Sequence, residues 1–472
     1  MLSIVSIIAL SLGIENVYAS HNPNLYVSAE NSAFNNHFAG SMVVEVVVND
    51  SDLKDIDDGI GEPDVTINGK DLRMVQGTDG SWYAYFANIQ QAKKADQIVT
   101  DAGIAAEGKS LDFGVFCSST TASSVLGTSF SQTQGVAISR SGGTISGFTN
   151  GQSTFSECTG EVTGGILKNN VIRSPKSINT NPSVLPGQIG LDPDVWPIIQ
   201  LFSFDDVEIK YNKPGKTQVV NLEYDEIPNI SMTLDRSNYP AGAEVFVTIN
   251  DIQLNQDPTD EDSWTFNINS TKRTFYQAYT ESGSDSGNGG VGLINIIPHL
   301  SSLDFEDNGE LTMSLGAILE LQTNDDQPDA FVSDGTNTFS QIVTLVETSP
   351  NSGIFRNYDN GKKSTIGVTS NAPRGQSGTI TYNDETKSIL TGSFSASVEL
   401  GTKGVSFEPG TTATVTITDI DQNVNSGKKD TLNVYSSNDI IPTLKTGNPL
   451  TLKSASAVKF YADTADPRGG GT

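Results

Sequence analysis

The sequence is poor in the residues that build metal and redox sites. Its 472 residues contain two cysteines, Cys117 and Cys158, and three histidines, so a zinc site made of Cys and His side chains is not expected. Basic residues are also scarce: 28 Lys and Arg stand against 56 Asp and Glu, which gives a formal net charge of −28. Nucleic-acid phosphates would repel such a chain, so the charge argues against nucleic acid as a partner and favours solubility and cation binding.

Long apolar runs are absent, with one short exception at the N-terminus. Residues 2–14 form an apolar run that is too short for a spanning helix, so we expect no membrane span. Val17-Tyr18-Ala19 follows, and its small residues suit signal-peptidase cleavage after Ala19. We therefore predict a signal peptide over 1–19 and a secreted chain. On such a chain a disulfide between Cys117 and Cys158 is favoured over the alternative of two buried thiols.

The sequence does contain a repeat. An alternating β-branched strand that runs into an acidic turn occurs three times, at Val46–Leu53, Val247–Asn255 and Val415–Asn423. The second and third copies stay in register, 168 positions apart, as far as Asp262 and Asp430. A repeat of this size indicates a string of similar β-domains. The Gly, Ser, Thr, Asn and Asp between the apolar runs are typical of a turn-rich all-β protein.

A second repeat suggests where the domains end. Ile209–Asn212 and Ile380–Asn383 share the pattern Ile-x-Tyr-Asn and lie 171 positions apart. We predict a first β-sandwich domain over 20–230, with an insertion pinned by the disulfide, and a second over 231–400. The start of a third, truncated domain is predicted over 401–472. We expect that it is completed by further sequence of a longer protein or by another chain.

Three shorter patterns predict local structure. Asn68-Gly69, between Val65–Ile67 and Leu72–Val75, predicts a hairpin with a type I′ turn. The only fair helix candidate is Ile89–Ala106, whose amphipathic pattern is weak. The aromatic run Trp82–Phe86 is expected to be buried in the core of a sandwich, and a sugar-binding platform is the alternative.

The acidic turns have the spacing of a calcium-binding loop. In the third copy, oxygen-bearing side chains occupy relative positions 1, 3, 5, 7 and 12, and alternate residues of a tight loop can converge on a hard cation. We predict a structural Ca²⁺ ion, with a solvated turn rich in Asp and Asn as the alternative. The candidate ligands are Asp419, Asp421, Asn423, Asn425 and Asp430 in the third copy, Asp251, Asn255 and Asp262 in the second, and Asp50 and Asp52 in the first.

No motif points to catalysis. A Gly-x-Ser-x-Gly elbow is missing, and no glycosidase carboxylate pair can be singled out at this acidity. We therefore expect a protein that is not an enzyme. Asn49, Asn229 and Asn269 each begin an Asn-x-Ser/Thr pattern and are predicted N-glycosylation sites on an exported chain.

Six segments carry a resemblance to a known family. They are Met74–Phe86, Lys176–Asn181, Trp196–Phe204, Val245–Trp264, Val343–Phe355 and Ala372–Asn383. In these segments the chain resembles the surface-layer (S-layer) proteins of ammonia-oxidising archaea. The resemblance implies tandem immunoglobulin-like β-sandwich domains in a glycosylated two-dimensional lattice at the cell surface. It also implies metal ions that support domains and contacts, and an acidic lattice that admits small cations such as ammonium.

The residues and the resemblance together predict a structural protein of the cell surface. We expect it to assemble with copies of itself into a cation-supported, glycosylated S-layer. Its acidic surface would concentrate small cations within a Debye length, about 8 Å at physiological salt. The alternative is a secreted adhesin or glycan-binding module that uses its loops and the region of Trp82.

Overall fold

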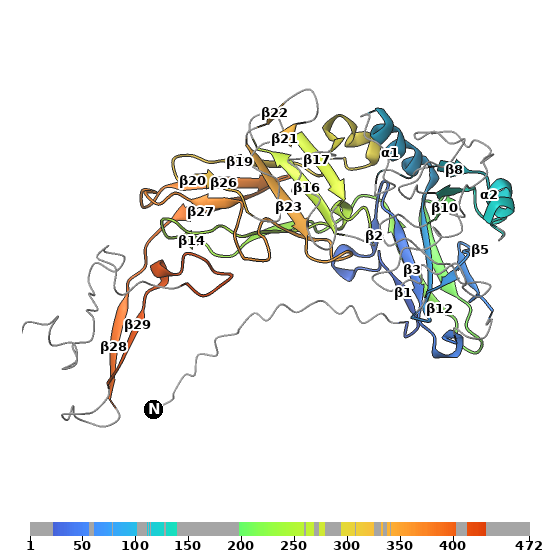
Figure 1. Cartoon of the computed structure of the whole chain (residues 1–472), viewed down its shortest axis with the longest axis horizontal. Helices are drawn as coiled ribbons and strands as arrows, with labels where there is room; N and C mark the ends of the chain where they lie inside the picture. Colours follow the sequence, from blue (N-terminus) through green and yellow to red (C-terminus); the bar gives the residue numbers. More distant parts are fainter. Residues whose placement is uncertain are drawn as a thin grey trace, which may run out of the picture. The chain divides into compact units, whose positions relative to one another are not determined.

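The computed structural model shows a chain built mainly of β-strands. It describes residues 22–55, 61–77, 79–101, 111, 113, 115–126, 129–138, 198–258, 261–268, 273–278, 294–306, 308–324, 332–333, 338–339, 341–402 and 413–430. Strands in several sheets dominate these residues (Figure 1), so the predicted all-β class is confirmed. The chain divides into two compact units, residues 1–393 and 394–472. The signal peptide predicted over 1–19 lies outside the described residues.

Unit 1 has two halves. The strands of the first half are β1 (Leu25–Val27), β2 (His37–Phe38), β3 (Val44–Val48), β4 (Val65–Ile67), β5 (Lys70–Asp71), β6 (Val75–Gln76), β7 (Trp82–Asn88), β8 (Val115–Cys117), β9 (Val136–Ile138), β10 (Ile199–Phe202), β11 (Asp206–Tyr211) and β12 (Gln218–Tyr224). Its helices are η1 (Ser32–Phe34), η2 (Ser51–Leu53), α1 (Ile89–Asp101) and α2 (Ser119–Leu126).

The second half of unit 1 contains more strands and only short 3₁₀ helices among the described residues. Its strands are β13 (Ser231–Leu234), β14 (Asn238–Tyr239), β15 (Val247–Asn250), β16 (Asp262–Asn267), β17 (Arg273–Ala278), β18 (Ile294–Asn295), β19 (Leu311–Ser314), β20 (Leu319–Leu321), β21 (Val332–Ser333), β22 (Thr338–Phe339), β23 (Ile342–Glu347), β24 (Ile354–Arg356), β25 (Ile366–Val368), β26 (Ser377–Tyr382) and β27 (Glu385–Thr391). Its 3₁₀ helices are η4 (Ile252–Leu254), η6 (Ile297–His299) and η7 (Ser301–Leu303).

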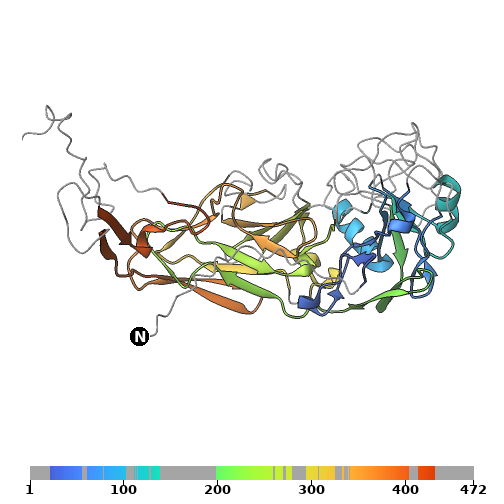
Figure 2. The same ribbon diagram turned by 90° about the horizontal axis from the view of Figure 1, so that it is seen from below.

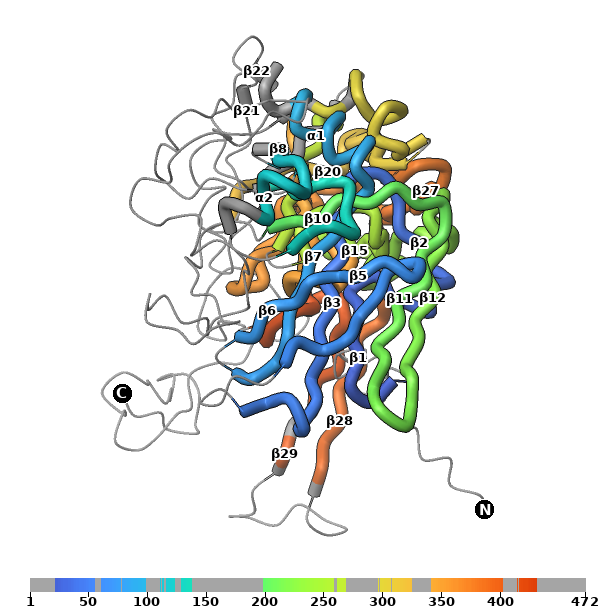
Figure 3. The backbone as a smooth tube through the Cα atoms, turned by 90° about the vertical axis from the view of Figure 1, so that its right-hand side faces the viewer, coloured from blue at the N-terminus to red at the C-terminus, as the bar shows by residue number. Residues whose placement is uncertain are grey.

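Each half pairs a larger sheet with a smaller one. Figure 2 shows the same strands turned by 90° from Figure 1. In the first half, sheet 1 has the order β1-β3-β7-β10-β9-β8, with β6 also on β7, and sheet 2 has the order β2-β12-β11-β4-β5. In the second half, sheet 3 has the order β13-β15-β24-β23-β16-β17-β18, and sheet 4 has the order β14-β27-β26-β19. Figure 3 follows β11 and β12 as neighbouring strands of sheet 2. The two-stranded pairs β20–β25 and β21–β22 complete the described part of unit 1.

The two halves repeat one pattern of strand pairing. β1 pairs antiparallel with β3 as β13 pairs with β15, which begins the larger sheet of each half. The smaller sheet of each half is built on an antiparallel pair, β11–β12 or β26–β27. Its last strand also pairs in parallel with a short early strand, as β12 does with β2 and β27 does with β14. The repeats seen in the sequence therefore correspond to a repeated two-sheet arrangement.

Strand β7 lies at the centre of the first half and is buried over its whole length. Alternate residues of a strand face opposite sides of the sheet. Trp82 and Phe86 join the apolar core between sheets 1 and 2, and Phe86 contacts Phe38 edge to face. Tyr83 and Tyr85 belong to the core on the opposite face, together with Ile89 of α1. The aromatic run is thus core, as predicted, and is not an exposed sugar platform.

Two local predictions are confirmed and one signal was missed. Asn68 and Gly69 have φ of 49° and 74°, as a type I′ turn requires, and join the paired strands β4 and β5. The second strand of this hairpin is Lys70–Asp71 and not the predicted Leu72–Val75. The helix predicted over Ile89–Ala106 is present over Ile89–Asp101, and residues 102–106 lie outside the described residues. Helix α2 was not predicted, because its Ser- and Thr-rich sequence, STTASSVL, reads as a turn.

A buried junction joins the two halves of unit 1. Ile252 of the second half belongs to the apolar core of the first. Gln256 accepts a hydrogen bond from the Ser41 hydroxyl at its side-chain oxygen (2.7 Å), and its carbonyl accepts from the Val43 amide (3.2 Å). Gly40 has φ of 59°, and a Cβ atom there would lie 2.2 Å from the Leu303 carbonyl oxygen, so only glycine allows the chains to approach this closely. The predicted domains 20–230 and 231–400 therefore share one compact unit.

Unit 2 begins at Phe394, close to the predicted start of the third domain at 401. Its described part is an antiparallel hairpin of β28 (Ser397–Thr402) and β29 (Ala413–Thr418), followed by the 3₁₀ helix η8 (Ile420–Gln422). The hairpin pairs Ser397 with Thr418, as β1–β3 and β13–β15 are paired in unit 1. The third sequence repeat thus forms the same first strand pair.

Candidate functional site

The three acidic turns share one local structure. Asp50, Asp251 and Asp419 each follow a strand, have an extended backbone and cap the following 3₁₀ helix, η2, η4 or η8. In each, the side chain accepts a hydrogen bond from the backbone amide two residues later. An aspartate is favoured at this position because its side-chain oxygen satisfies an amide that the helix leaves without a partner.

In the first turn, Asp50 links three parts of the first half. It is 1% exposed. Its Oδ1 accepts from the Asp52 amide (3.1 Å), and its Oδ2 accepts from the Tyr211 hydroxyl of β11 (2.7 Å). The Lys213 ammonium donates to the same carboxylate (2.8 Å) and lies 3.4 Å from Asp52, which is exposed. The positive charge beside the first turn is thus the ammonium group of Lys213.

In the second turn, Asp251 makes the corresponding contact without an ammonium group. It is completely buried. Its Oδ1 accepts from the Gln253 amide (2.9 Å), and its Oδ2 accepts from the Tyr382 hydroxyl of β26 (2.6 Å). Tyr382 also lies 3.2 Å from Oδ1 of Asn308, whose amide nitrogen donates to Gln253 (2.8 Å). The second turn is therefore held by uncharged donors.

Because only the first turn contains an ammonium group, the pKa of Asp50 is lowered and the pKa of Asp251 is raised. Burial acts to raise the pKa of Asp50, but hydrogen bonds from Lys213 and Tyr211 outweigh it and hold that pKa below its usual value. Burial raises the pKa of Asp251, and the hydrogen bonds from Tyr382 and Asn308 offset only part of this effect. The first turn thus favours an ionised aspartate, whereas the second disfavours it.

The first and second turns are each also tied to the larger sheet by a tryptophan. The Trp82 indole donates to the carbonyl of Leu53 (3.0 Å), and the Trp264 indole donates to the carbonyl of Leu254 (2.7 Å). Leu53 and Leu254 both lie three positions after the capping aspartate. Sequence reasoning missed this contact because Trp82 follows its aspartate by 32 positions and Trp264 by 13.

The acidic residues expected to close the calcium loop close a hydrogen-bonded turn in the structure. Asp262 is completely buried, and its Oδ2 accepts from the amides of Gln256 (2.5 Å) and Asp257 (3.0 Å). Asp430, its counterpart in the third copy, accepts from the amide of Asn425 (3.1 Å). The spacing that predicted a metal-binding loop is therefore also the spacing of a turn in which an aspartate at each end accepts hydrogen bonds from backbone amides.

In the third turn the capping Asp419 is half-buried, whereas Asp50 and Asp251 are buried. Asp419 accepts from the Asp421 amide (3.1 Å), and both oxygens of Asp421 lie 2.9 Å from the Phe394 amide. Asn425 accepts from the Gly427 amide (2.9 Å). With its amide nitrogen oriented toward them, Asn423 donates to the Asn425 carbonyl (3.0 Å) and to Asp430 (3.3 Å).

The remaining metal candidates have protein partners as well. Asn255, in the second turn, donates to Asn351 (2.7 Å), while its side-chain oxygen is buried and has no hydrogen-bond partner among the described residues. Within the described residues, no group of three or more Asp, Glu, His or Cys side chains is placed to hold a metal ion. The Ca²⁺ ion stays a prediction. At Asp50 and Asp251 it would have to compete with donors that already fill the carboxylate.

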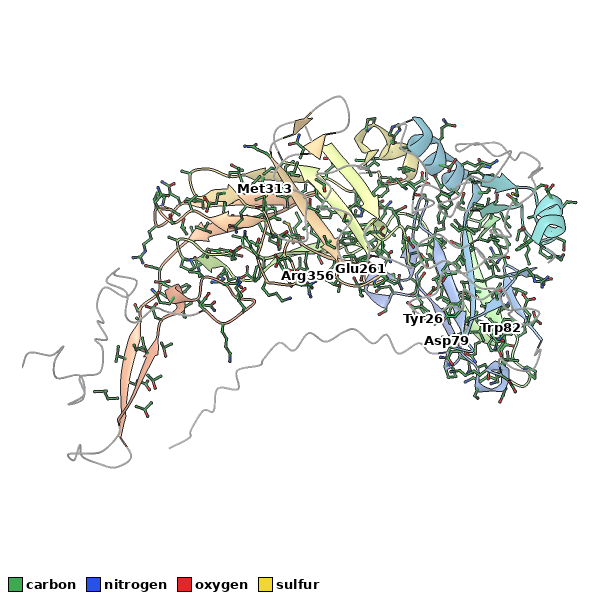
Figure 4. All side chains as sticks on the ribbon, viewed as in Figure 1. Tyr26, Asp79, Trp82, Glu261, Met313 and Arg356 are labelled. Carbon is green, nitrogen blue, oxygen red and sulfur yellow. The ribbon has the colours of Figure 1, made fainter. Side chains whose placement is uncertain are left out.

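Two buried glutamates near the junction were not foreseen. Glu45 of β3 accepts from the Tyr85 hydroxyl (2.5 Å), and burial, with smaller effects of Asp257 and Asp79, raises its pKa to about 7. Glu347, at the end of β23, accepts from the Ser352 and Gly353 amides, and burial raises its pKa to about 8. A single acidic residue within an apolar strand was the signal for both. Glu261, which is labelled in Figure 4, has a charge that adds to the raised pKa of Glu347.

The predicted modification sites differ in their surroundings. Asn49 is exposed at the end of β3, next to the first turn. Asn229 is also exposed, but its side-chain amide donates to the Ala33 carbonyl (3.0 Å). Cys117 is buried and disulfide-bonded. Asn269 and Cys158 lie outside the described residues.

Comparison with protein-family models gives no match, and comparison with curated proteins gives none either. Neither α-helix in the described part of the chain is long and apolar enough to cross a membrane. The internal repeat is therefore the feature from which function is argued.

Proposed function

We propose that this chain is a structural cell-surface protein that assembles with copies of itself into an S-layer lattice. The observation that carries the proposal is the repetition of one two-sheet arrangement, with the same Asp–Tyr and Trp–carbonyl contacts in both halves of unit 1. In each half these buried polar contacts hold the two sheets together, as a lattice subunit requires.

The finer fold assignment belongs to the same proposal. We infer that each half is an immunoglobulin-like β-sandwich and that the hairpin of unit 2 begins a third. A core between two facing sheets supports this reading, since Phe38 of sheet 2 packs against Phe86 of sheet 1. So does the antiparallel pairing that dominates both halves.

Charge gives the proposed lattice a second role. A chain with a formal net charge of −28 produces a negative field at its surface. In a porous sheet this field would concentrate small cations and exclude anions within a Debye length, about 8 Å at physiological salt. Equal permeability of an assembled sheet to small cations and small anions would contradict this role.

Secretion, glycosylation and calcium complete the proposal. The exposed Asn49 is the best-placed glycan acceptor of the two described sites, because Asn229 already donates to a backbone carbonyl. The third turn is the proposed place for Ca²⁺, because its Asp419 is only half-buried and has no tyrosine or lysine partner among the described residues.

Electron microscopy of the purified chain, with millimolar calcium or with a chelator, tests the lattice. We expect ordered sheets or rings in calcium. The variant D421N should lose them, whereas the variant E399Q, which alters an exposed carboxylate of the neighbouring hairpin, should keep them. Monodisperse particles in both conditions would contradict self-assembly. Sheets that form equally well in chelator would contradict the calcium part alone.

A further inference from the structure

One face of sheet 1 is turned toward the second half of unit 1. Glu45 of β3 lies on this face, in register with Tyr85 of β7. Val47, two positions further along β3, is in register with Tyr26 of β1. Partners in register, and residues two positions apart on a strand, point to the same side of a sheet. The side-chain nitrogen of Asn351, in the second half, donates to the Tyr26 hydroxyl (2.5 Å), so this side of sheet 1 faces the junction.

Glu45 is buried beside a backbone contact that crosses the junction. The residue is 8% exposed, and its amide donates to the Ser28 hydroxyl (2.9 Å). Val43, two residues earlier, donates its amide to the Gln256 carbonyl of the second half (3.2 Å). The negative charge of Asp257, the next residue, acts on the Glu45 carboxyl group. Separation of the two halves would therefore bring this carboxyl group into water.

The groups around the Glu45 carboxyl favour its neutral form. Burial has the largest effect, and the charges of Asp257 and of Asp79, which precedes β7, add to it. A hydrogen bond from the Tyr85 hydroxyl (2.5 Å) acts in the opposite sense but is outweighed, and the pKa of Glu45 rises to about 7. The other ionisable groups on this side of β1 and β7 are hydroxyls, those of Tyr26, Tyr83 and Tyr85.

Proton binding by Glu45 is thus linked to the docking of the two halves. In an open junction the carboxyl group would titrate near its ordinary pKa of 4.5, whereas in the closed junction its pKa is about 7. The closed junction therefore binds the proton more tightly than the open one. This contribution to docking is fully present below pH 4.5 and is lost as the pH rises through 7. A local opening of this kind requires less free energy than the unfolding of a whole half.

We propose that the protonation state of Glu45 controls the docking of the two halves of unit 1. With its proton, the carboxyl group stays packed between Tyr85 and the second half. Without it, the carboxylate favours an open junction, in which water reaches it and the hydrogen bonds from Val43 and Ser41 to Gln256 are broken. The chain then responds to pH near neutrality by a change in how its halves are joined. This inference does not depend on the lattice proposal.

Thiol labelling of the full chain tests the opening. Ser41 is 1% exposed at the junction, so the thiol of the variant S41C is protected from a pyridyl disulfide reagent while the junction is closed. We expect its labelling rate, relative to a model thiol at the same pH, to rise at least about tenfold from pH 5 to pH 7. The thiol of V220C, in the core between sheets 1 and 2, should label more slowly at pH 7, because only unfolding of the first half exposes it. Hydrogen exchange at the Val43 amide of the unsubstituted chain, corrected for its intrinsic rate, should show the same rise.

Two matched variants identify the responsible group. Glu45→Gln keeps an acceptor for the Tyr85 hydroxyl and cannot ionise, so in the S41C background it should remove the rise in labelling. Glu320→Gln neutralises an exposed carboxylate of β20 and should leave the rise unchanged. A labelling rate that does not rise with pH, equal labelling of S41C and V220C at each pH, or a rise that persists with Glu45→Gln would each overturn the proposal.

Discussion

The first and second acidic turns have the same sequence pattern, the same cap and the same bond to a tyrosine, yet opposite electrostatics. Asp50 faces Lys213, and its pKa is lowered. Asp251 faces only uncharged donors, and its pKa is raised. Both turns therefore share the tyrosine contact, and they differ in whether a charged side chain also binds the aspartate.

Position in the repeat explains the difference. The second turn lies at the junction of the two halves, where Ile252 enters the core of the first half and Gln256 binds Ser41 and Val43. Solvent cannot reach such a turn, so a lysine there would have to be buried. The first turn has Asp52 at its surface, with a side chain that is 77% exposed, and a lysine can neutralise it at little desolvation cost.

Replacing the capping aspartates is expected to give the largest difference between the turns. Asp251→Ala should lower the free energy of unfolding by about 3 kcal/mol, because the buried Tyr382 hydroxyl and the Gln253 amide lose their acceptor. Asp50→Ala should lower it by about 1–2 kcal/mol, because water can replace the carboxylate at this more open turn. Urea unfolding followed by tryptophan fluorescence measures both.

Asparagine at the same positions is the control for this comparison. Asp251→Asn keeps an oxygen for the Gln253 amide and removes a disfavoured charge, so it should change stability by less than about 0.5 kcal/mol. Asp50→Asn removes the partner of Lys213 and should be the more destabilising of the two. If the alanine and asparagine series ranked the two turns in the same order, the proposed difference in electrostatics would be wrong.

The buried glutamates predict how stability depends on pH. Glu45 and Glu347 have pKa values raised from 4.5 to about 7 and about 8, respectively. Between pH 4.5 and these raised values, the folded protein therefore binds more protons than the unfolded chain. Their contribution is fully present below pH 4.5 and is lost as the pH rises through 7 and 8. The free energy of unfolding should therefore fall across this range.

Glu45→Gln isolates one half of this effect. The variant keeps an acceptor for the Tyr85 hydroxyl and no longer titrates, so the decrease should become smaller by roughly 3 kcal/mol. The lowered pKa values of Asp50 and Glu385 act in the opposite sense and remove stability only in acid. Stability that is constant or rises between pH 5 and pH 8 would contradict the burial of uncompensated carboxyl groups.

The smallest expected effect concerns Lys213. Lys213→Met removes the ammonium group from the first turn and leaves its stem, so the variant should unfold at a slightly lower urea concentration. The difference from the unchanged protein should shrink in about 1 M salt, where the Debye length is about 3 Å. Lys387→Met, which removes the ammonium group that pairs with Glu385, serves as the surface control. A difference that does not depend on salt would show that Lys213 acts through packing.

Much of the local structure could be predicted from the sequence. Alternating β-branched residues identified β3, β15 and β29, and Asn68-Gly69 identified the turn between β4 and β5. These signals depend on neighbours along the chain, so they can be read without the fold. The Ile-x-Tyr-Asn repeat marked Tyr211 and Tyr382 as special but did not show what they bind.

The sequence by itself determined that this protein is an acidic, repetitive all-β chain with an aspartate at the end of each repeated strand. Only the tertiary structure decided what those aspartates do. The tyrosine that meets Asp50 comes from 161 residues away, and the one that meets Asp251 from 131 residues away. Calcium-loop spacing and a doubly capped turn place carboxylates at the same positions. The donors that distinguish them are brought in by the facing sheet, and no local pattern encodes them.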